Sequence, residues 1–494
     1  MTPERVGGLP LYLAWPLRVM AGIAWLIYLF FFSVYLASAE WVMIAAMAGL
    51  VLCICFVVYD LRLIAVIWFA GSPTVFVFAN NILDALPFAT VERVIFFGLT
   101  AIMICLLALR KRNPLPLDTI EKLIFAFLAL AALGMARHLY MRPQYEWKSE
   151  VAFYLQGYFM PMLSYWLMRR LNWTDAWVVR YLFAVACISV ILAFQGVSQI
   201  YLGMGLFVPT WVDVINEGRA TGAFSNATEF GVACLISMLF CLLLQSYVKD
   251  KALWVLLLVL AVFAAFGLFL CKTRAPWLAA VICMMIVFVH DRHQRPMIAT
   301  AVGLGICAIF VALPFIVESE LFKYRLTDIR PIYARISLYA SGVLILLDHP
   351  ILGIGMGRNA FQAVKGDYLI SFMGISYDEG QRTGPPHNEW LGIMTMTGLV
   401  GISLYIAIHV KILSRLKEIR RDATLTPFQR LMAIYVTAIF VSQIVISMFV
   451  DTGYLLYTTS ATFGAVGIVS SRWQRTSDWM QDCCQFGPAS KEKH

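Results

Sequence analysis

The chain has 494 residues, of which 61% are hydrophobic and only 14% are charged, and its mean hydropathy is +0.78. Soluble proteins contain roughly half apolar and a quarter charged residues, so this composition excludes an ordinary soluble protein. It predicts a polytopic integral membrane protein, and the net charge of +9 is then a signal of membrane topology rather than of nucleic-acid binding. Most of the 11 cysteines lie within apolar runs, without the spacing of a metal site or a disulfide framework.

Apolar runs of about 20 residues, the length needed to cross the hydrocarbon core, recur along the chain. They predict an all-α protein with about fourteen transmembrane helices, the fifth of them short, because barrel strands would be about half as long and would alternate in polarity. The predicted ranges are Met20–Ser38, Trp41–Tyr59, Leu63–Ala79, Val94–Leu109, Leu123–Met135, Val151–Met168, Val178–Leu202, Glu229–Tyr247, Leu253–Cys271, Pro276–His290, Met297–Val317, Trp390–Val410, Leu431–Val450 and Tyr454–Ser470.

Lysine and arginine gather in the loops on one side of these predicted helices, and the positive-inside rule makes that side the cytoplasm. Both termini are then cytoplasmic, and residues 318–387 face outward. That outward stretch is itself basic, against the usual bias, which favours an anionic ligand there. The predicted organisation is N-terminal transmembrane helices (1–175), central transmembrane helices (176–317), a large outer loop with interfacial helices (318–388), C-terminal transmembrane helices (389–471) and a cytoplasmic tail (472–494).

A histidine stands at the point where the outer loop meets an apolar run. His387 is followed by Asn388 and Glu389, and an imidazole that exchanges a proton near neutral pH suits general-base chemistry at the membrane face. The structural alternative is an interfacial histidine at a helix start. Gly398 and Gly401 fall on one side of the helix that follows, at a spacing that permits close backbone approach to another helix.

Three arginines are predicted to face outward with this histidine. Arg219 precedes the eighth predicted span, Arg274 lies between the ninth and tenth, and Arg335 lies in a segment apolar enough to form an interfacial helix. A single arginine in such a place more often reaches for lipid headgroups. Several on the face of His387 favour a phosphate-binding cluster, because a guanidinium group holds phosphate oxygens in a fork.

Two further features are weaker. The glycine-rich run Gly353–Gly357 has no preceding strand, so we expect a loop that shapes the site rather than a phosphate cradle. Asp451, between the last two predicted spans, is expected to pair with an arginine or to cap a helix.

These residues together resemble the bacterial O-antigen ligases and the related O-antigen and exopolysaccharide polymerases. The resemblance covers roughly residues 219–404 and departs from the family in two respects: Asn226-Ala-Thr stands in place of the more usual Asn-Pro-Asn, and about fourteen spans exceed the usual dozen. The matching motifs are His387-Asn388 followed by Gly398-Leu-Val-Gly401, Arg219-Ala-Thr-Gly222-Ala-Phe224-Ser-Asn226, Arg335 before the amphipathic helix, and His349-Pro350-Ile-Leu-Gly353-Ile-Gly355.

The resemblance implies a membrane-embedded, GT-C-type glycosyltransferase in the bacterial inner membrane, with its active site facing the periplasm. It implies inverting, metal-independent transfer of a glycan from polyprenyl (undecaprenyl) pyrophosphate to a hydroxyl of the lipid A core, with no cofactor and no nucleic acid. His387 would be the catalytic base, and Arg219, Arg274 and Arg335 would bind the pyrophosphate. Supporting roles would fall to Asn388, Glu389, Gly398 and Gly401.

Two alternatives remain open. A polymerase would move the growing chain onto the next lipid-linked repeat unit, and no residue identifies the acceptor. A multi-span transporter belongs to another class. It would place its charged groups near the bilayer midplane, often within paired repeats, whereas here they are predicted at one membrane face.

Overall fold

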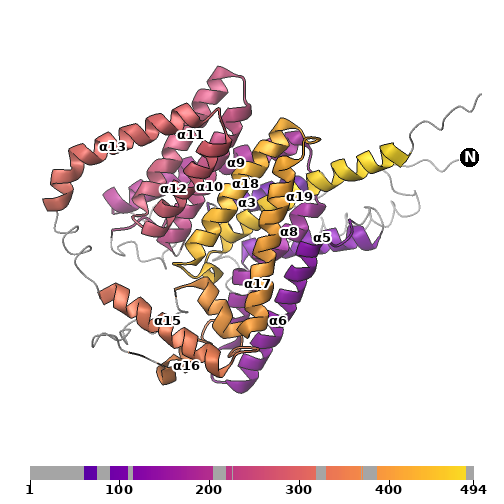
Figure 1. Cartoon of the computed structure of the whole chain (residues 1–494), viewed down its shortest axis with the longest axis vertical. Coiled ribbons are helices and arrows are strands. Elements are labelled where there is room, and N and C mark those ends of the chain that lie inside the picture. Colours follow the sequence, from indigo (N-terminus) through magenta and orange to yellow (C-terminus); the bar gives the residue numbers. More distant parts are fainter. Residues whose placement is uncertain are drawn as a thin grey trace, which may run out of the picture.

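The computed structural model describes residues 60–74, 90–109, 115–203, 218–224, 226–318, 330–368, 370 and 387–485, and within these ranges every regular element is helical (Figure 1). The elements are α3 (Leu61–Gly71), α5 (Val91–Ala108), α6 (Thr119–Met141), α7 (Trp147–Tyr154), η2 (Leu155–Phe159), α8 (Met160–Arg170), α9 (Asp175–Tyr201), α10 (Ala227–Tyr247), α11 (Lys251–Leu270), α12 (Arg274–His290), α13 (Arg295–Glu318), α15 (Arg330–Asp348), α16 (Gln362–Lys365), η3 (Gly366–Tyr368), α17 (Glu389–Arg421), α18 (Pro427–Ser447), η4 (Thr452–Tyr454) and α19 (Leu456–Gln485).

Seven of the described helices are long and apolar enough to cross a membrane: α5, α6, α9, α10, α11, α17 and α18. They fall on predicted ranges, as α9 does on Val178–Leu202, so the described part of the chain is consistent with a polytopic all-helical membrane protein. The fifth predicted span is not short, since α6 has 23 residues. The total of about fourteen stays a prediction, because Met20–Ser38 and Trp41–Tyr59 lie outside the described residues.

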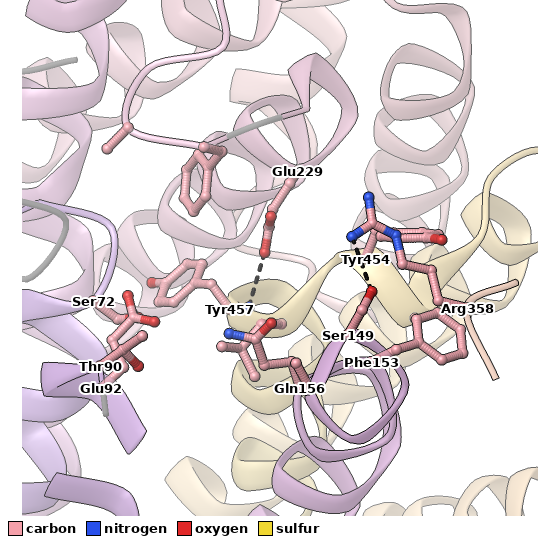
Figure 2. Close-up of a pocket in the computed structure, with 15 residues that line it drawn as sticks. Ser72, Thr90, Glu92, Ser149, Phe153, Gln156, Glu229, Arg358, Tyr454 and Tyr457 are labelled. Carbon is pink, nitrogen blue, oxygen red and sulfur yellow. Dashed lines mark hydrogen bonds between the residues drawn. The ribbon is translucent and has the colours of Figure 1, made fainter. Parts of the chain in front are cut away.

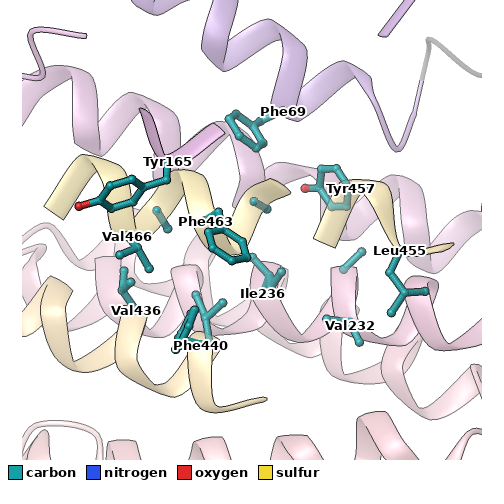
Figure 3. Close-up of a cluster of buried hydrophobic side chains, with 14 of the residues drawn as sticks. Phe69, Tyr165, Val232, Ile236, Val436, Phe440, Leu455, Tyr457, Phe463 and Val466 are labelled. Atoms are coloured by element: carbon teal, nitrogen blue, oxygen red, sulfur yellow. The ribbon is translucent and has the colours of Figure 1, made fainter. Parts of the chain in front are cut away.

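Helix α10 forms the centre of the bundle. Every residue from Thr228 to Gln245 is buried, as expected for a helix that is apolar on all sides and enclosed by others. Ile236 of α10, Phe440 of α18, Phe463 of α19 and Tyr165 of α8 meet in one cluster (Figure 3). Outer helices instead expose apolar side chains, such as Val281 on α12 at 64%, which is the pattern of a lipid-facing surface.

Two buried arginines at the end of α8 have a structural role. Arg169 donates to Glu121 at 2.8 Å, and Arg170 forms a second ion pair with the same carboxylate. All three side chains are buried, so removing one of them would leave an uncompensated charge. This cluster fixes the start of α6 against the end of α8.

Helices α7 and α8 are joined without a loop by the π-helix η2. A π-helix adds one residue to a turn and is frequent at functional sites. Here it brings Gly157 so close to η4 that a Cβ atom would lie 2.6 Å from the carbonyl oxygen of Gly453. It also places the Tyr158 side chain next to Glu389.

The predicted interfacial segment around Arg335 is the helix α15. It lies with the short α16 at the lower end of the molecule in Figure 1, whereas the connection between α10 and α11 lies at the upper end. The outer-loop segments therefore gather at one end of the bundle.

Candidate functional site

His387 immediately precedes the first turn of α17. Its backbone has φ 53°, an uncommon value for a residue other than glycine, and such strain is concentrated at functional sites. The Asn388 side chain accepts a hydrogen bond from the Leu391 N–H at 3.1 Å and so caps the helix. Asn388 thus fixes where α17 begins, because its side-chain oxygen caps the N-terminus of the helix.

Arg335 lies within electrostatic reach of His387. Partial burial, and then the positive charge of Arg335, lower the pKa of the His387 imidazole. The ring is therefore neutral at pH 7 and able to accept a proton. The Arg335 side chain is exposed, so its guanidinium group is accessible to a ligand beside the ring.

Glu389 is paired with another carboxyl group. One of its oxygens accepts a hydrogen bond from the Gly453 N–H at 3.2 Å, and Asp451 lies beside it. Both carboxyl groups are buried. Burial, and then the proximity of Glu389, raise the pKa of Asp451, so its carboxyl group keeps its proton to higher pH than a free aspartate does. Asp451 was expected to pair with an arginine or to cap a helix; it instead faces a second acid.

Helix α17 folds back on itself at Gly398, which has φ 65° and ψ −166°. Nineteen residues separate Trp390 from His409, and a straight helix would hold them about 28 Å apart. Their rings are 5.0 Å apart, so Glu389–Thr397 packs against the longer arm that follows. The predicted continuous span Trp390–Val410 is therefore wrong, because the apolar run contains a reversal that hydropathy does not register.

The glycine-rich loop fills the break in α17. Ile354 and Gly355 donate their N–H groups to the carbonyl oxygens of Thr395 and Met396, each at 3.0 Å. In return, the Leu399 N–H donates to the Pro350 carbonyl at 2.7 Å. These hydrogen bonds satisfy backbone groups that the reversal would otherwise leave unpaired inside the bundle.

Gly398 does permit close backbone approach, but to this loop rather than to another helix. A Cβ atom there would overlap the carbonyl group of Ile351. A Cβ atom on Gly401 would meet Thr397 of the preceding arm. The absence of a Cβ atom at both glycines therefore allows α17 to reverse direction.

Arg219 and Arg274 lie at the junction of α11 and α12. The turn that carries Arg219 is held by Gln199, whose side-chain oxygen accepts from the N–H groups of Thr221 at 2.9 Å and Gly222 at 2.8 Å. Arg219 is half-buried near Cys271, and Arg274 is the exposed first residue of α12. The four predicted residues thus fall into two groups, Arg219 with Arg274 and Arg335 with His387.

A cavity of about 310 Å³ adjoins the Arg219 turn and the contact between Gly453 and Glu389; we call it the Glu229 cavity. The Arg219 turn contributes Ala223 and Phe224 to its wall. The other wall includes Gly453, whose N–H donates to Glu389, two residues from His387. Figure 2 shows Ser72, Thr90 and Glu92 at one end and Arg358, Ser149 and Tyr454 at the other. The lining residues are Ser72, Thr90, Glu92, Ser149, Ala152, Phe153, Gln156, Ala223, Phe224, Glu229, Arg358, Gly453, Tyr454, Leu456 and Tyr457.

Sequence reasoning missed the acidic residues of this cavity. Glu229 was included in a predicted span without being singled out, although a carboxyl group within an apolar helix is a default functional candidate. Glu92, just ahead of another predicted span, carried a weaker signal. Gln156 could not be found from sequence, because only the π-helix determines which way it points.

Comparison with known families matches a region that contains most of the sequence-predicted site residues. Residues 259–406 match a family model described as O-antigen ligase. This region, which is less than half of the chain, is similar to the O-antigen ligase family. The matched O-antigen ligase region contains Arg274, Arg335, His387 and Gly398, whereas Arg219 precedes it. No curated protein matches the chain.

Proposed function

We propose that the protein is an O-antigen ligase-type glycosyltransferase of the bacterial inner membrane. It moves a glycan from polyprenyl pyrophosphate to an acceptor hydroxyl of the lipid A core at the periplasmic face, with inversion and without a metal ion. The observation that carries the proposal is the proximity of a neutral His387 and Arg335 within the O-antigen ligase region.

In this reaction His387 takes the proton of the acceptor hydroxyl while its oxygen attacks the anomeric carbon. The bond from that carbon to the pyrophosphate oxygen breaks, and the lipid pyrophosphate departs with the bonding electrons. Arg335 stabilises the negative charge that develops on the leaving group, and Arg219 and Arg274 hold it from the other side of the Glu229 cavity. The reversal at Gly398 fixes the short arm that carries His387.

The test is a transfer assay with purified protein, a lipid-linked glycan and the lipid A core. We expect His387→Ala to lower turnover about a hundredfold or more with donor binding retained, because loss of a general base affects the chemical step. His290→Ala is the matched control, since His290 is exposed and bonded to Arg420 at the opposite end of the bundle. Normal transfer by His387→Ala would remove His387 from this role.

The same site would serve a polymerase, which differs only in its acceptor. A deletion strain separates the two: a ligase mutant keeps polymer on the carrier lipid and lacks it on lipid A, whereas a polymerase mutant stalls at one repeat unit.

A further inference from the structure

The Glu229 cavity has the chemistry of a carbohydrate site rather than of a phosphate site. We propose that it is a subsite for one uncharged sugar ring, whose hydroxyl groups form hydrogen bonds with Glu229, Gln156 and Glu92. Its volume of about 310 Å³ lies at the lower end of the range for small-molecule sites, about 300–1,000 Å³.

The polar groups of the cavity suit hydroxyl ligands. Glu229 is buried, and its oxygen that accepts from the Tyr457 N–H at 2.8 Å is held in place by that bond. The Gln156 side chain makes no hydrogen bond with the part of the chain that the structure describes, although it lines the cavity. A carboxylate accepts and a carboxamide both donates and accepts, so together they match the hydroxyl groups of a sugar.

Aromatic rings form the apolar part of the wall. The rings of Phe224 and Tyr457 lie 5.8 Å apart, and those of Phe153 and Tyr454 lie 5.4 Å apart. Such rings give an apolar surface beside the polar groups, which fits the C–H faces of a pyranose as well as its hydroxyl edge.

Charge argues against a phosphate in this position. Glu92 and Glu229 are close enough to influence each other, and a phosphate between them would have two carboxyl groups as neighbours in place of cationic donors. Arg358 is at one end only, where it donates to Ser149 at 3.5 Å. The predicted pyrophosphate-binding arginines do not line the cavity. The site would therefore hold the sugar inside the cavity and the diphosphate at its margin.

The cavity is also placed to serve the reaction, and in this respect the inference rests on the proposed function. Gly453 lines the cavity and bonds to Glu389, so a ring bound there lies near His387. The ring could belong to the donor glycan or to the acceptor; the chemistry that recognises it is the same.

Sugar binding can be tested without transfer. Saturation-transfer NMR on the full chain in detergent would use glucose, galactose, mannose and N-acetylglucosamine as probes, with inorganic pyrophosphate as competitor. We expect at least one sugar to bind, and Gln156→Ala and Glu229→Gln each to weaken it about tenfold or more, the loss expected for a hydrogen bond to a charged or buried group. Glu418→Gln, at a side chain that is 58% exposed on α17, is the matched control.

The subsite would be overturned by the absence of neutral sugar binding, or by equal binding in both variants and the control. Displacement of the sugar by pyrophosphate would also overturn it. Gln156→Ala removes no hydrogen bond among the residues that the structure describes, so its effect is separable from misfolding. Sugar binding that persists in a protein unable to transfer glycan would refute the proposed function and leave the subsite standing.

The transfer assay then shows whether the sugar ring in the cavity belongs to the acceptor or to the donor. A raised KM for the acceptor in Gln156→Ala would place the acceptor sugar in the cavity, and a raised KM for the donor would place the donor glycan there. Unchanged KM values for both substrates would overturn the subsite.

Discussion

Gly398→Ala tests the reversal in α17. The backbone at this position has φ 65° and ψ −166°, a region that only glycine adopts readily, and holding another residue there costs about 1–3 kcal/mol. The added Cβ would also overlap the Ile351 carbonyl group and lie 2.7 Å from the Gly353 nitrogen. Both neighbours are backbone atoms, so the glycine-rich loop must move.

Movement of that loop breaks the hydrogen bonds that join it to α17. Loss of the bonds from Leu399 to Pro350, at 2.7 Å, and from Ile354 to Thr395, at 3.0 Å, costs about 1 kcal/mol each. With the strain, the free energy of unfolding should fall by about 3–5 kcal/mol. Transfer activity should fall as well, because the arm that carries His387 is displaced.

The assay is denaturant unfolding of the purified protein in micelles, with two glycine controls. Gly98→Ala lies within α5 with no atom within 4 Å of the new methyl group, so it should leave stability unchanged or raise it. Gly203→Ala has φ 61° and no close neighbour, so it should show the backbone strain alone, about 1–2 kcal/mol. If Gly398→Ala destabilises the protein no more than Gly203→Ala, the account of the reversal is wrong.

Further predictions concern the charged groups near His387. Arg335→Lys should lower the transfer rate about tenfold or more, because the ammonium group of lysine cannot replace the two-pronged donor of arginine. Arg295→Lys, at the opposite end of the bundle, should transfer normally. Equal transfer rates in the two variants would refute two-pronged binding by Arg335. Arg335→Gln should move the acidic limb of the pH–rate profile to higher pH, since the arginine helps to lower the pKa of His387; an unmoved limb would contradict this. Because the pKa of Asp451 is raised on folding, its contribution to stability is present below the unfolded value near 3.8 and is lost as pH rises toward the folded value. The melting temperature should therefore depend less on pH between pH 5 and 9 in Asp451→Asn than in the wild type. Asp422→Asn is the control. Because the pKa of Asp422 is shifted downward, its titration lies at acid pH, and this variant should keep the wild-type dependence of melting temperature on pH.

The sequence predicted the helices well where burial in lipid or protein requires a continuous apolar run, as at α9 and α11. It could not predict the reversal within α17, because Trp390–Val410 is apolar throughout and only Gly398 marks the break. The pairing of Glu389 with Asp451 depends on packing between helices distant in sequence. The arginines were found as candidates because they are predicted to face outward, and His387 because it stands where the outer loop meets an apolar run. Their division into two groups follows only from the fold.

The π-helix η2 has a consequence for tolerance to insertion and deletion. A π-helical turn holds about one residue more than an α-helical turn, so deleting a single residue from Leu155–Phe159 would restore regular winding and leave α7 and α8 in nearly the same relative orientation. The side chains within the turn, Gln156 among them, would change direction. The helices would therefore tolerate the deletion, while the wall of the Glu229 cavity would change although no cavity side chain had been replaced.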